Sequence, residues 1–372
     1  QDFLLKREAI ASLFLYLLKI YQMKIIYYSL IILTFVSSCK EDSKDNPVFA
    51  NDYGEGMYIA SENGVSFYNG VIVKNKVFQS VNGVSLNNVN KIKFRGTKAY
   101  IATNNSLYSA NIETFENKGE AGGFMNLFDF DFVYMQRIFA VDKNDSKVLV
   151  VDMDKMEITS DIETGDITNP SFIISNWYRS IVLNSGEIAD TLKDSTIIAI
   201  NNKDVAIPLA DFMGSIDVGD NPNSAVWIAD LKVLCKGIYD ENNLISNTES
   251  SLVKVNGFDM RVAWSQNLND IYNAKNLVSD ATNSKYFFTA IDGVYQMNND
   301  GSGITKRINF TSDFITLKVE GYFQADTLNY ANMLYVNDAA NNPNTIYKYN
   351  IITNQFCDTI VVDSPVNDVS FY

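Results

Sequence analysis

The chain has 372 residues, with 44 Asp and Glu against 30 Lys and Arg and no histidine, which gives a net charge of −14. Such an acidic surface repels phosphate backbones, so we expect no nucleic acid among its partners. The lack of histidine excludes Ser-His-Asp and Cys-His catalysis and removes the usual ligands of zinc and haem, so we predict no metal site and no cofactor.

Residues 23–38 have the pattern of a secretory signal peptide. Met23 and Lys24 begin a basic segment, an apolar run extends from Ile25 to Ser38, and Cys39 follows directly after two small residues. This run of 14 residues is shorter than the about 20 that a membrane-spanning helix needs. We therefore predict a signal peptide over residues 23–38, and we interpret residues 1–22 as translated sequence upstream of the true start.

The stretch FVSSC, which ends at Cys39, resembles the lipobox of bacterial lipoproteins, in which the cysteine is lipidated and becomes the first residue of the mature chain. The alternative is an ordinary signal peptide that ends at a chance cysteine. Lys40, Glu41 and Asp42 resemble the surface-export signal of Bacteroidetes lipoproteins, although a plain polar tether would have the same composition. The resemblance implies a lipid anchor in the outer membrane and a protein on the cell surface.

Residues 39–50 are then a lipidated, flexible tether. Residues 1–38 hold four Lys or Arg and two Asp or Glu, so their removal changes the net charge from −14 to −16.

From residue 51 onward, short runs rich in Tyr, Phe, Val and Ile alternate with turns rich in Asn, Asp and Gly. The two-residue alternation indicates strands, and the turns indicate hairpins. Seven hairpins recur, with starts at residues 56, 98, 137, 187, 232, 284 and 332. A strand repeat with a period in the forties is typical of a β-propeller. We predict an all-β, seven-bladed propeller over residues 51–372.

The two ends of this region predict how the ring closes. A further strand precedes most hairpins, such as VNKIKF before residue 98, but the hairpin at residue 56 has little that is strand-like before it. The chain instead ends with the strand PVNDVSFY at residues 365–372, which no hairpin follows. We expect this strand to become the innermost strand of the first blade, which removes the open sheet edges. An open sandwich of seven hairpins is the alternative.

The segment VGDNPNSAVWIADLKVLCKG at residues 218–237, followed by SSLVKVNG, resembles the YncE-like, seven-bladed propeller lipoproteins of Bacteroidetes. MLYVNDAANNPNTIYKYN near the end resembles their last blade. Such proteins are typically encoded beside TonB-dependent outer-membrane transporters, and one branch captures cobalamin for its transporter. The resemblance therefore implies a small-molecule nutrient as ligand, cobalamin or another corrinoid, and a TonB-dependent receptor as partner. None of that branch's ligand contacts is carried over.

The loops that lead into the innermost strands of a propeller border its central funnel on one face, where side chains from all blades converge. Amide, aromatic and cationic side chains at such positions suit a large polar ligand with flat faces. The predicted ligand-binding residues are Asn88, Asn90, Trp177, Tyr178, Arg179, Asn221, Asn223, Tyr272, Lys275, Tyr322, Phe323 and Asn367. A turn role is the alternative for each asparagine, and packing is the alternative for Trp177, Tyr178 and Arg179.

The sequence favours a binding protein over an enzyme. A structural or adhesive surface scaffold is one alternative, and a carboxylate-based glycan-active enzyme is another, with Asp129 and Asp131 in LFDFDF as its candidate pair. Strand alternation puts both aspartates on one face, where solvent exposure is the simpler explanation. Cys235 and Cys357 lie in strand-like runs, and we expect them to be buried free thiols, with a disulfide between them as the alternative.

Overall fold

A computed structural model describes residues 52–134, 136–145, 147–163, 169–185, 194–202, 212–242, 244–257 and 259–372. The predicted signal peptide, the lipidation site Cys39, the export signal Lys40, Glu41 and Asp42, and the tether lie outside the described residues. None of the helices within these ranges has the length and apolar character that crossing a membrane requires.

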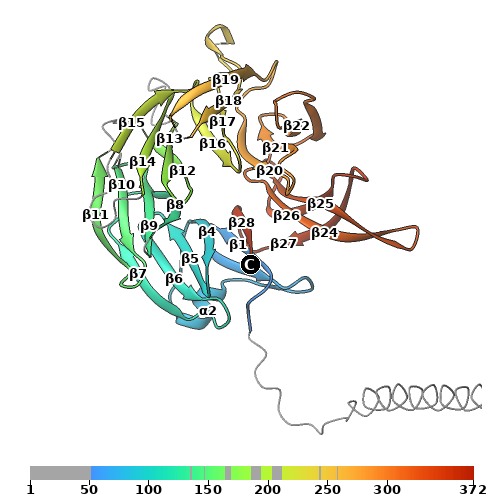
Figure 1. The fold of residues 1–372 in the computed structure, drawn as a ribbon. Helices are drawn as coiled ribbons and strands as arrows, with labels where there is room; N and C mark the ends of the chain where they lie inside the picture. Colours follow the sequence, from blue (N-terminus) through green and yellow to red (C-terminus); the bar gives the residue numbers. More distant parts are fainter. Residues whose placement is uncertain are drawn as a thin grey trace, which may run out of the picture. The chain divides into compact units, whose positions relative to one another are not determined.

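Seven four-stranded antiparallel sheets form the blades of a propeller around a central axis (Figure 1). From the innermost strand outward, blade 1 has β28 (Val366–Phe371), β1 (Met57–Ser61), β2 (Gly64–Tyr68) and β3 (Val73–Lys74). Blade 2 has β4 (Val89–Arg95), β5 (Lys98–Thr103), β6 (Ser106–Asn111) and β7 (Asn117–Gly122). Blade 3 has β8 (Leu127–Val133), β9 (Arg137–Asp142), β10 (Lys147–Asp152) and β11 (Glu157–Glu163).

Blade 4 has β12 (Pro170–Ser175), β13 (Arg179–Asn184), β14 (Thr196–Asn201) and β15 (Phe212–Asp217). Blade 5 has β16 (Pro222–Trp227), β17 (Leu231–Cys235), β18 (Ser251–Asn256) and β19 (Arg261–Asn267). Blade 6 has β20 (Lys275–Ser279), β21 (Lys285–Ala290), β22 (Gly293–Asn298) and β23 (Thr305–Ile308). Blade 7 has β24 (Thr316–Gln324), β25 (Thr327–Asp338), β26 (Asn342–Asn350) and β27 (Gln355–Val361). Two short helices, α2 (Val77–Asn82) and η1 (Leu244–Ser246), lie in connections.

The C-terminal strand closes the ring, and the predicted all-β, seven-bladed fold is confirmed. β28 lies beside β1 (Figure 1) and pairs antiparallel with it. In this register Ile59 lies opposite Val369 and Met57 lies opposite Phe371. Val369 is buried in a cluster that joins blade 1 to blade 7. Blade 1 is therefore built from both ends of the propeller sequence.

The core consists of clusters of buried side chains between the faces of neighbouring blades. Neighbouring residues of one strand point into different clusters, because side chains alternate across a sheet. In β13, for example, Ile181 packs in the cluster with blade 5 and Val182 in the cluster with blade 3. Both faces of a blade are thus covered, which explains why the inner strands have continuous apolar runs.

The start of blade 4 differs from the prediction, which placed its hairpin within residues 187–202. The hairpin instead pairs β13 with β14, and the innermost strand is the earlier β12. The side-chain oxygen of Asn176 accepts hydrogen bonds from the backbone N–H groups of Tyr178 and Arg179, both at 2.8 Å, which closes a tight turn between β12 and β13. The NWYR segment is therefore a hairpin turn and does not lead into an innermost strand.

Blade 7 shows the same one-strand error. β24 extends to Gln324, and the turn to β25 has Ala325 and Asp326 at φ values of 49° and 60°. Two successive positive φ values are typical of a type I′ hairpin turn. Tyr322 and Phe323 therefore lie at the end of an innermost strand and not before its start.

Cys235 and Cys357 are free thiols, as predicted. Cys235 is buried, and burial raises the pKa of its thiol to about 12. Cys357 is exposed because β27 is the outermost strand of blade 7, so the expected burial was wrong for this residue.

Candidate functional site

The innermost strands begin on one face of the propeller and end on the other. We call the first the upper face; it carries the connections into the innermost strands and the turns between second and third strands. The lower face carries the turns between first and second strands. Seven predicted residues lie on the upper face, within three residues of an innermost-strand start, namely Asn88, Asn90, Asn221, Asn223, Tyr272, Lys275 and Asn367.

The other five predicted residues lie on the lower face. Trp177, Tyr178 and Arg179 come from the β12–β13 turn, and Tyr322 and Phe323 come from the end of β24. We had expected these residues just before the start of an innermost strand. That prediction was wrong, because both segments lie at the end of the innermost strand of their blade, next to the turn into the second strand. The twelve predicted residues therefore do not form one site.

The aromatic side chains of the β12–β13 turn are open to solvent. Trp177 is 66% exposed and Tyr178 is 52% exposed. The ring of Trp177 packs edge-on against that of Tyr134, with 5.0 Å between the centroids. The Arg179 side chain packs back onto the protein, since its guanidinium donates a hydrogen bond to the carbonyl oxygen of Gly257 at 2.6 Å.

Four of the upper-face asparagines stabilise the backbone. Asn88 and Asn221 have positive φ values of 50° and 54°, and the Asn221 amide also donates to the Gly237 carbonyl oxygen at 2.9 Å. The side-chain amides of Asn90 and Asn367 each donate, at 2.9 Å, to a backbone carbonyl oxygen of the next blade. These four asparagines therefore have structural roles in turns or between blades. Among the predicted residues of the upper face, Tyr272 and Lys275 remain as the aromatic and cationic candidates for ligand contact.

Asp129 and Asp131 link blade 3 to its neighbours and are not a solvent-exposed pair. Asp129 is buried, forms an ion pair with Lys93 at 3.0 Å and accepts a hydrogen bond from the backbone N–H of Ile173 at 3.1 Å. Asp131 accepts from the backbone N–H of Ser175 at 2.6 Å. Burial raises the pKa of Asp131, and the nearby Lys93 charge opposes that shift. The expectation of solvent exposure was wrong, because the neighbouring blades cover this strand.

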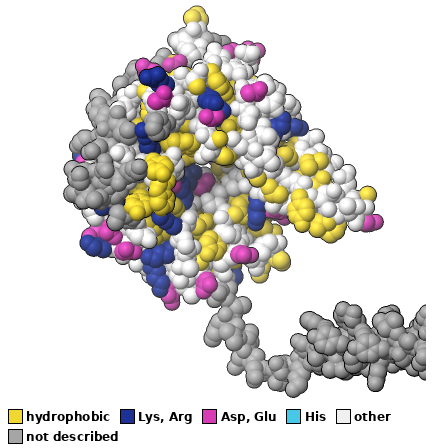
Figure 2. All heavy atoms as spheres, in the orientation of Figure 1, with side chains coloured by type: hydrophobic (Ala, Val, Ile, Leu, Met, Phe, Trp, Pro, Cys, Tyr) yellow, Lys and Arg dark blue, Asp and Glu magenta, His cyan; other side chains and the backbone are white. Residues whose placement is uncertain are grey.

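A further ion pair joins two innermost strands. Lys91 of blade 2 pairs with Asp368 of blade 1 at 3.3 Å. Figure 2 shows one face of the propeller, where side chains of both charge signs lie around a central hollow. Among the described ranges, no group of His, Cys, Asp and Glu is arranged to hold a metal ion.

Three lysines on the upper face lie within electrostatic range of one another, and we call them the lysine cluster: Lys143, Lys236 and Lys275. Lys143 directly follows β9 and Lys236 directly follows β17, so they occupy equivalent positions in blades 3 and 5. Lys275 is the first residue of β20 in blade 6. Of these three lysines, only Lys275 was predicted from the sequence as a ligand-binding residue. Lys143 and Lys236 could have been found from their shared position directly after the second strand of a blade.

Burial and like charges both act on the pKa values of the lysine cluster. Burial lowers the pKa of all three ammonium groups and is the largest cause for each. The charges of Lys275 and Lys143 lower the pKa of Lys236 further, to about 8. Lys275 likewise lowers the pKa of Lys143, whereas Asp313 partly offsets the effect of burial on Lys275. Such like-charge groups in a partly desolvated site attract an anion.

Aromatic and amide groups surround the lysine cluster. The rings of Tyr239 and Tyr272 lie with centroids 5.7 Å apart, and the Lys143 ammonium lies 4.8 Å from the ring centroid of Phe128. The backbone N–H of Asn273 donates to the Lys236 carbonyl oxygen at 3.0 Å. Within the part of the chain that the structure describes, the buried side-chain oxygen of Asn273 has no hydrogen-bond partner. Cationic, aromatic and unpaired amide groups from several blades are thus close together on this face.

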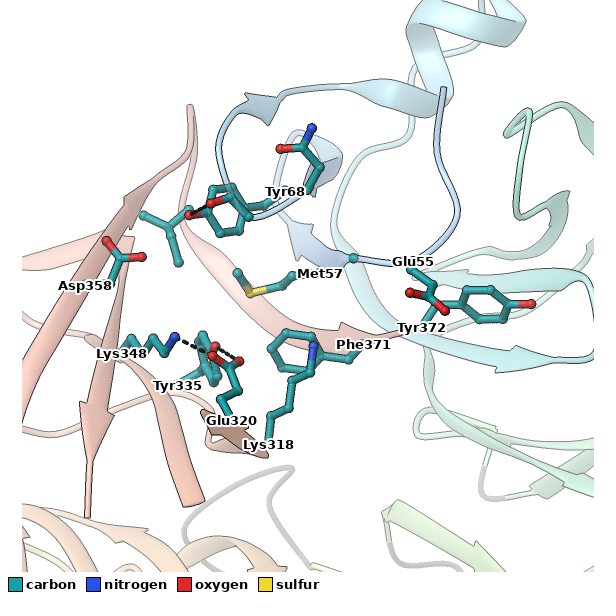
Figure 3. A pocket seen from close by; sticks show the side chains of 14 residues that line it. Glu55, Met57, Tyr68, Lys318, Glu320, Tyr335, Lys348, Asp358, Phe371 and Tyr372 are labelled. Carbon is teal, nitrogen blue, oxygen red and sulfur yellow. Dashed lines mark hydrogen bonds and ion pairs between the residues drawn. The ribbon is translucent and has the colours of Figure 1, made fainter. Parts of the chain in front are cut away.

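A second candidate is a cavity of about 450 Å³ between blades 7 and 1 (Figure 3). Lys348 and Tyr335 both point at Glu320 and donate hydrogen bonds to its carboxylate (Figure 3). The Lys318 ammonium lies 4.3 Å from the ring centroid of Phe371. The Glu320, Lys348 and Tyr335 side chains therefore satisfy one another within blade 7, and Lys318 contacts Phe371 across the ring closure, which favours a structural role.

No protein-family model matches the sequence, and the search of curated proteins finds no match either. Among solved structures, the chain is similar to a quinonprotein alcohol dehydrogenase-like protein from Bacteroides thetaiotaomicron, with 13% identity, a TM-score of 0.60 and coverage of 85% of this chain and 78% of that one. It is also similar to a proposed 6-phosphogluconolactonase from Bacteroides fragilis, with 11% identity, a TM-score of 0.58 and coverage of 88% and 100%. Identities this low support the shared propeller fold alone.

Proposed function

We propose that the protein is a non-catalytic capture protein, which binds a small-molecule nutrient on the upper face of its propeller. The observation that carries this proposal is the convergence of the lysine cluster with the Tyr239–Tyr272 pair. Rigid aromatic rings beside cationic groups provide apolar contact area and charge-assisted hydrogen bonds to one ligand. The candidate carboxylates Asp129 and Asp131 already accept hydrogen bonds from a neighbouring blade, which favours capture over glycan hydrolysis.

We further propose that the chain is a surface-exposed lipoprotein of the outer membrane, which presents its ligand to a TonB-dependent transporter. The resemblance of the sequence to YncE-like surface lipoproteins supports this setting, and it makes cobalamin or another corrinoid the first ligand to test. A structural or adhesive scaffold is the second candidate, and the exposed aromatic pair of Tyr134 and Trp177 on the lower face favours it.

Calorimetric titration of the purified protein tests the capture function. The ligands are cobalamin, cobinamide, haem and a panel of oligosaccharides, and we expect at least one of them to bind with a dissociation constant in the micromolar range or below. If oligosaccharides or haem bind and both corrinoids do not, the corrinoid proposal fails while capture stands. If nothing in the panel binds, the scaffold becomes the better account.

Labelling of cells with a palmitate analogue tests the membrane anchor. We expect the wild type to be labelled and Cys39→Ser to be unlabelled, because lipidation needs the thiol of that residue. Alanine at Lys40, Glu41 and Asp42 should preserve labelling and abolish protease accessibility on intact cells. Equal labelling of wild type and Cys39→Ser would overturn the lipid anchor, and continued protease accessibility of the alanine variant would overturn the export signal.

A further inference from the structure

The hairpin of β24 and β25 projects from blade 7 at the lower face, and we call its residues 319–332 the arm. β24 has nine residues and β25 has twelve, whereas the other innermost strands have five to seven. The two strands run out to a hairpin that protrudes from the ring (Figure 1). We infer that the arm rests on the surface of a lipid bilayer, namely the membrane that holds Cys39, and this inference rests on the proposed lipid anchor.

One face of the arm is apolar and exposed. Its four large side chains come from alternate positions of the two strands, namely Val319, Phe323, Leu328 and Tyr330. Phe323 is 77% exposed and Tyr330 is 67% exposed, and the other two are about half exposed. Leu334 continues the same face inward and is buried against blade 6. The apolar face of the core thus continues into the arm, where none of the described blades covers it.

The opposite face of the arm is fixed against the propeller. Glu320 accepts hydrogen bonds from Lys348 and Tyr335, and Tyr322 packs against the core cluster between blades 7 and 1. The apolar face is therefore held in one orientation before anything binds to it. A contact that requires no ordering of the arm loses less conformational entropy.

The chain that leads to the predicted lipid anchor enters the propeller beside the arm. The described residues begin at Asp52, and Glu55 lines the same cavity between blades 1 and 7 as Glu320 of the arm (Figure 3). Cys39 lies 13 positions before Asp52, so an extended chain between them spans at most about 45 Å. A lipid at Cys39 therefore keeps this side of the lower face within that distance of the membrane.

Area and charge favour a bilayer over a second copy of the chain. The exposed parts of the four apolar side chains cover roughly 450 Å², only half of the ~800 Å² that each partner buries in a standard protein interface. Two copies would also repel each other, because each has a net charge of −14. Aromatic side chains favour the membrane–water interface, and a small apolar contact suffices where a lipid already holds the protein there.

The arm contacts the bilayer surface and does not cross it. Residues 319–332 contain two acids, Glu320 and Asp326, and no Lys or Arg. Asp326 is exposed at the tip, and its charge is costly to bury in hydrocarbon, so we expect the arm to lie flat among the headgroups. The lower face then faces the membrane, and the upper face with its proposed ligand site faces the medium.

Quenching of tryptophan fluorescence by brominated phosphatidylcholine tests the contact. The lipidated protein is reconstituted into vesicles of this lipid, and the wild type gives the background of the three native Trp residues. We expect Phe323→Trp to lose most of its added fluorescence, relative to vesicles of unbrominated phosphatidylcholine. Ile245→Trp is the matched control, because Ile245 is 99% exposed in η1 on the upper face, and its added fluorescence should not change.

Two further measurements show whether the apolar face makes the contact. Leu328→Trp should be quenched as Phe323→Trp is, and it should lose most of that quenching when Phe323→Ser and Tyr330→Ser are added. Melting temperatures should match that of the wild type, since the substituted side chains are largely exposed. Phosphatidylglycerol in the vesicles should not increase the quenching, because the arm has no cationic side chain.

The outcomes separate the arm from the anchor. Equal quenching of Phe323→Trp and Ile245→Trp in palmitate-labelled protein would overturn the arm contact and leave the anchor intact. A protein without the palmitate label would remove the anchor and this inference together. Sedimentation could instead show concentration-dependent association that Phe323→Ser with Tyr330→Ser abolishes. With Phe323→Trp unquenched, that result would assign the apolar face to a second copy and contradict the bilayer contact.

Discussion

Deletion of residues 366–372 should abolish the cooperative unfolding transition of the propeller. The deletion removes β28, which pairs with β1 and buries Val366 and Val369. Each large buried apolar side chain contributes about 1.5–3 kcal/mol, and a domain of this kind has a net stability of about 5–15 kcal/mol. The loss also exposes the edge of β1, which then lacks a hydrogen-bonding neighbour.

β28 also joins the neighbouring blades, so its loss opens the ring on both sides. The Asn367 amide donates to the Val89 carbonyl oxygen of blade 2 at 2.9 Å, and the Thr316 hydroxyl of blade 7 donates to the Val369 carbonyl oxygen at 2.7 Å. Circular dichroism during heating measures the effect. A synthetic peptide of residues 365–372 should restore part of the transition. A truncated chain that melts at the wild-type temperature would show that β28 does not close the ring.

Substitution of Asp129 by alanine should cost about 3–5 kcal/mol of unfolding free energy, as expected when one partner of a buried ion pair is removed. Asp129 is 2% exposed, and its loss leaves the partly buried Lys93 without its nearest carboxylate. It also leaves the Ile173 backbone N–H without its acceptor from blade 3. Urea unfolding measures the change in free energy.

Asp230→Ala is the matched control for this prediction. The Asp230–Lys254 pair is short, at 2.7 Å, but the Asp230 side chain is 44% exposed. Solvent screening reduces such a pair to about 0–1 kcal/mol. Equal losses in the two variants would mean that the links between innermost strands contribute no more than surface ion pairs.

The hairpins were predictable because their signals are local: an apolar alternating run, a polar turn and a second run. The closure by β28 was also predictable. The hairpin that starts at residue 56 has no strand before it, and the strand at residues 365–372 has no hairpin after it, so the two complete one blade. The prediction of strands failed in blade 4, because only four residues separate the runs SFIIS and SIVLN. NWYR between them has large side chains that resemble a longer loop, and the Asn176 turn that joins the runs depends on side-chain orientation.

Alternation correctly put Asp129 and Asp131 on one face of β8, but sequence alone did not show that the face is covered. In a propeller, each blade face packs against a neighbour, so an alternating polar residue near the axis becomes a link between blades. The lysine cluster was harder still. Lys143, Lys236 and Lys275 lie in three repeats, and their convergence depends on how the ring closes.

The central claim is that a ligand binds on the upper face, and a comparison of two aromatic variants tests it most directly. Any ligand of the nutrient panel that binds the wild type is titrated into Tyr272→Ala and Trp177→Ala, with melting temperatures measured in parallel. Tyr272 adjoins the lysine cluster, whereas Trp177 lies on the lower face. We predict that Tyr272→Ala weakens binding about thirty-fold, the effect of losing an aromatic anchor worth about 2 kcal/mol, and that Trp177→Ala binds as the wild type does. Binding that Trp177→Ala weakens and Tyr272→Ala leaves unchanged would place the ligand on the lower face and contradict this account.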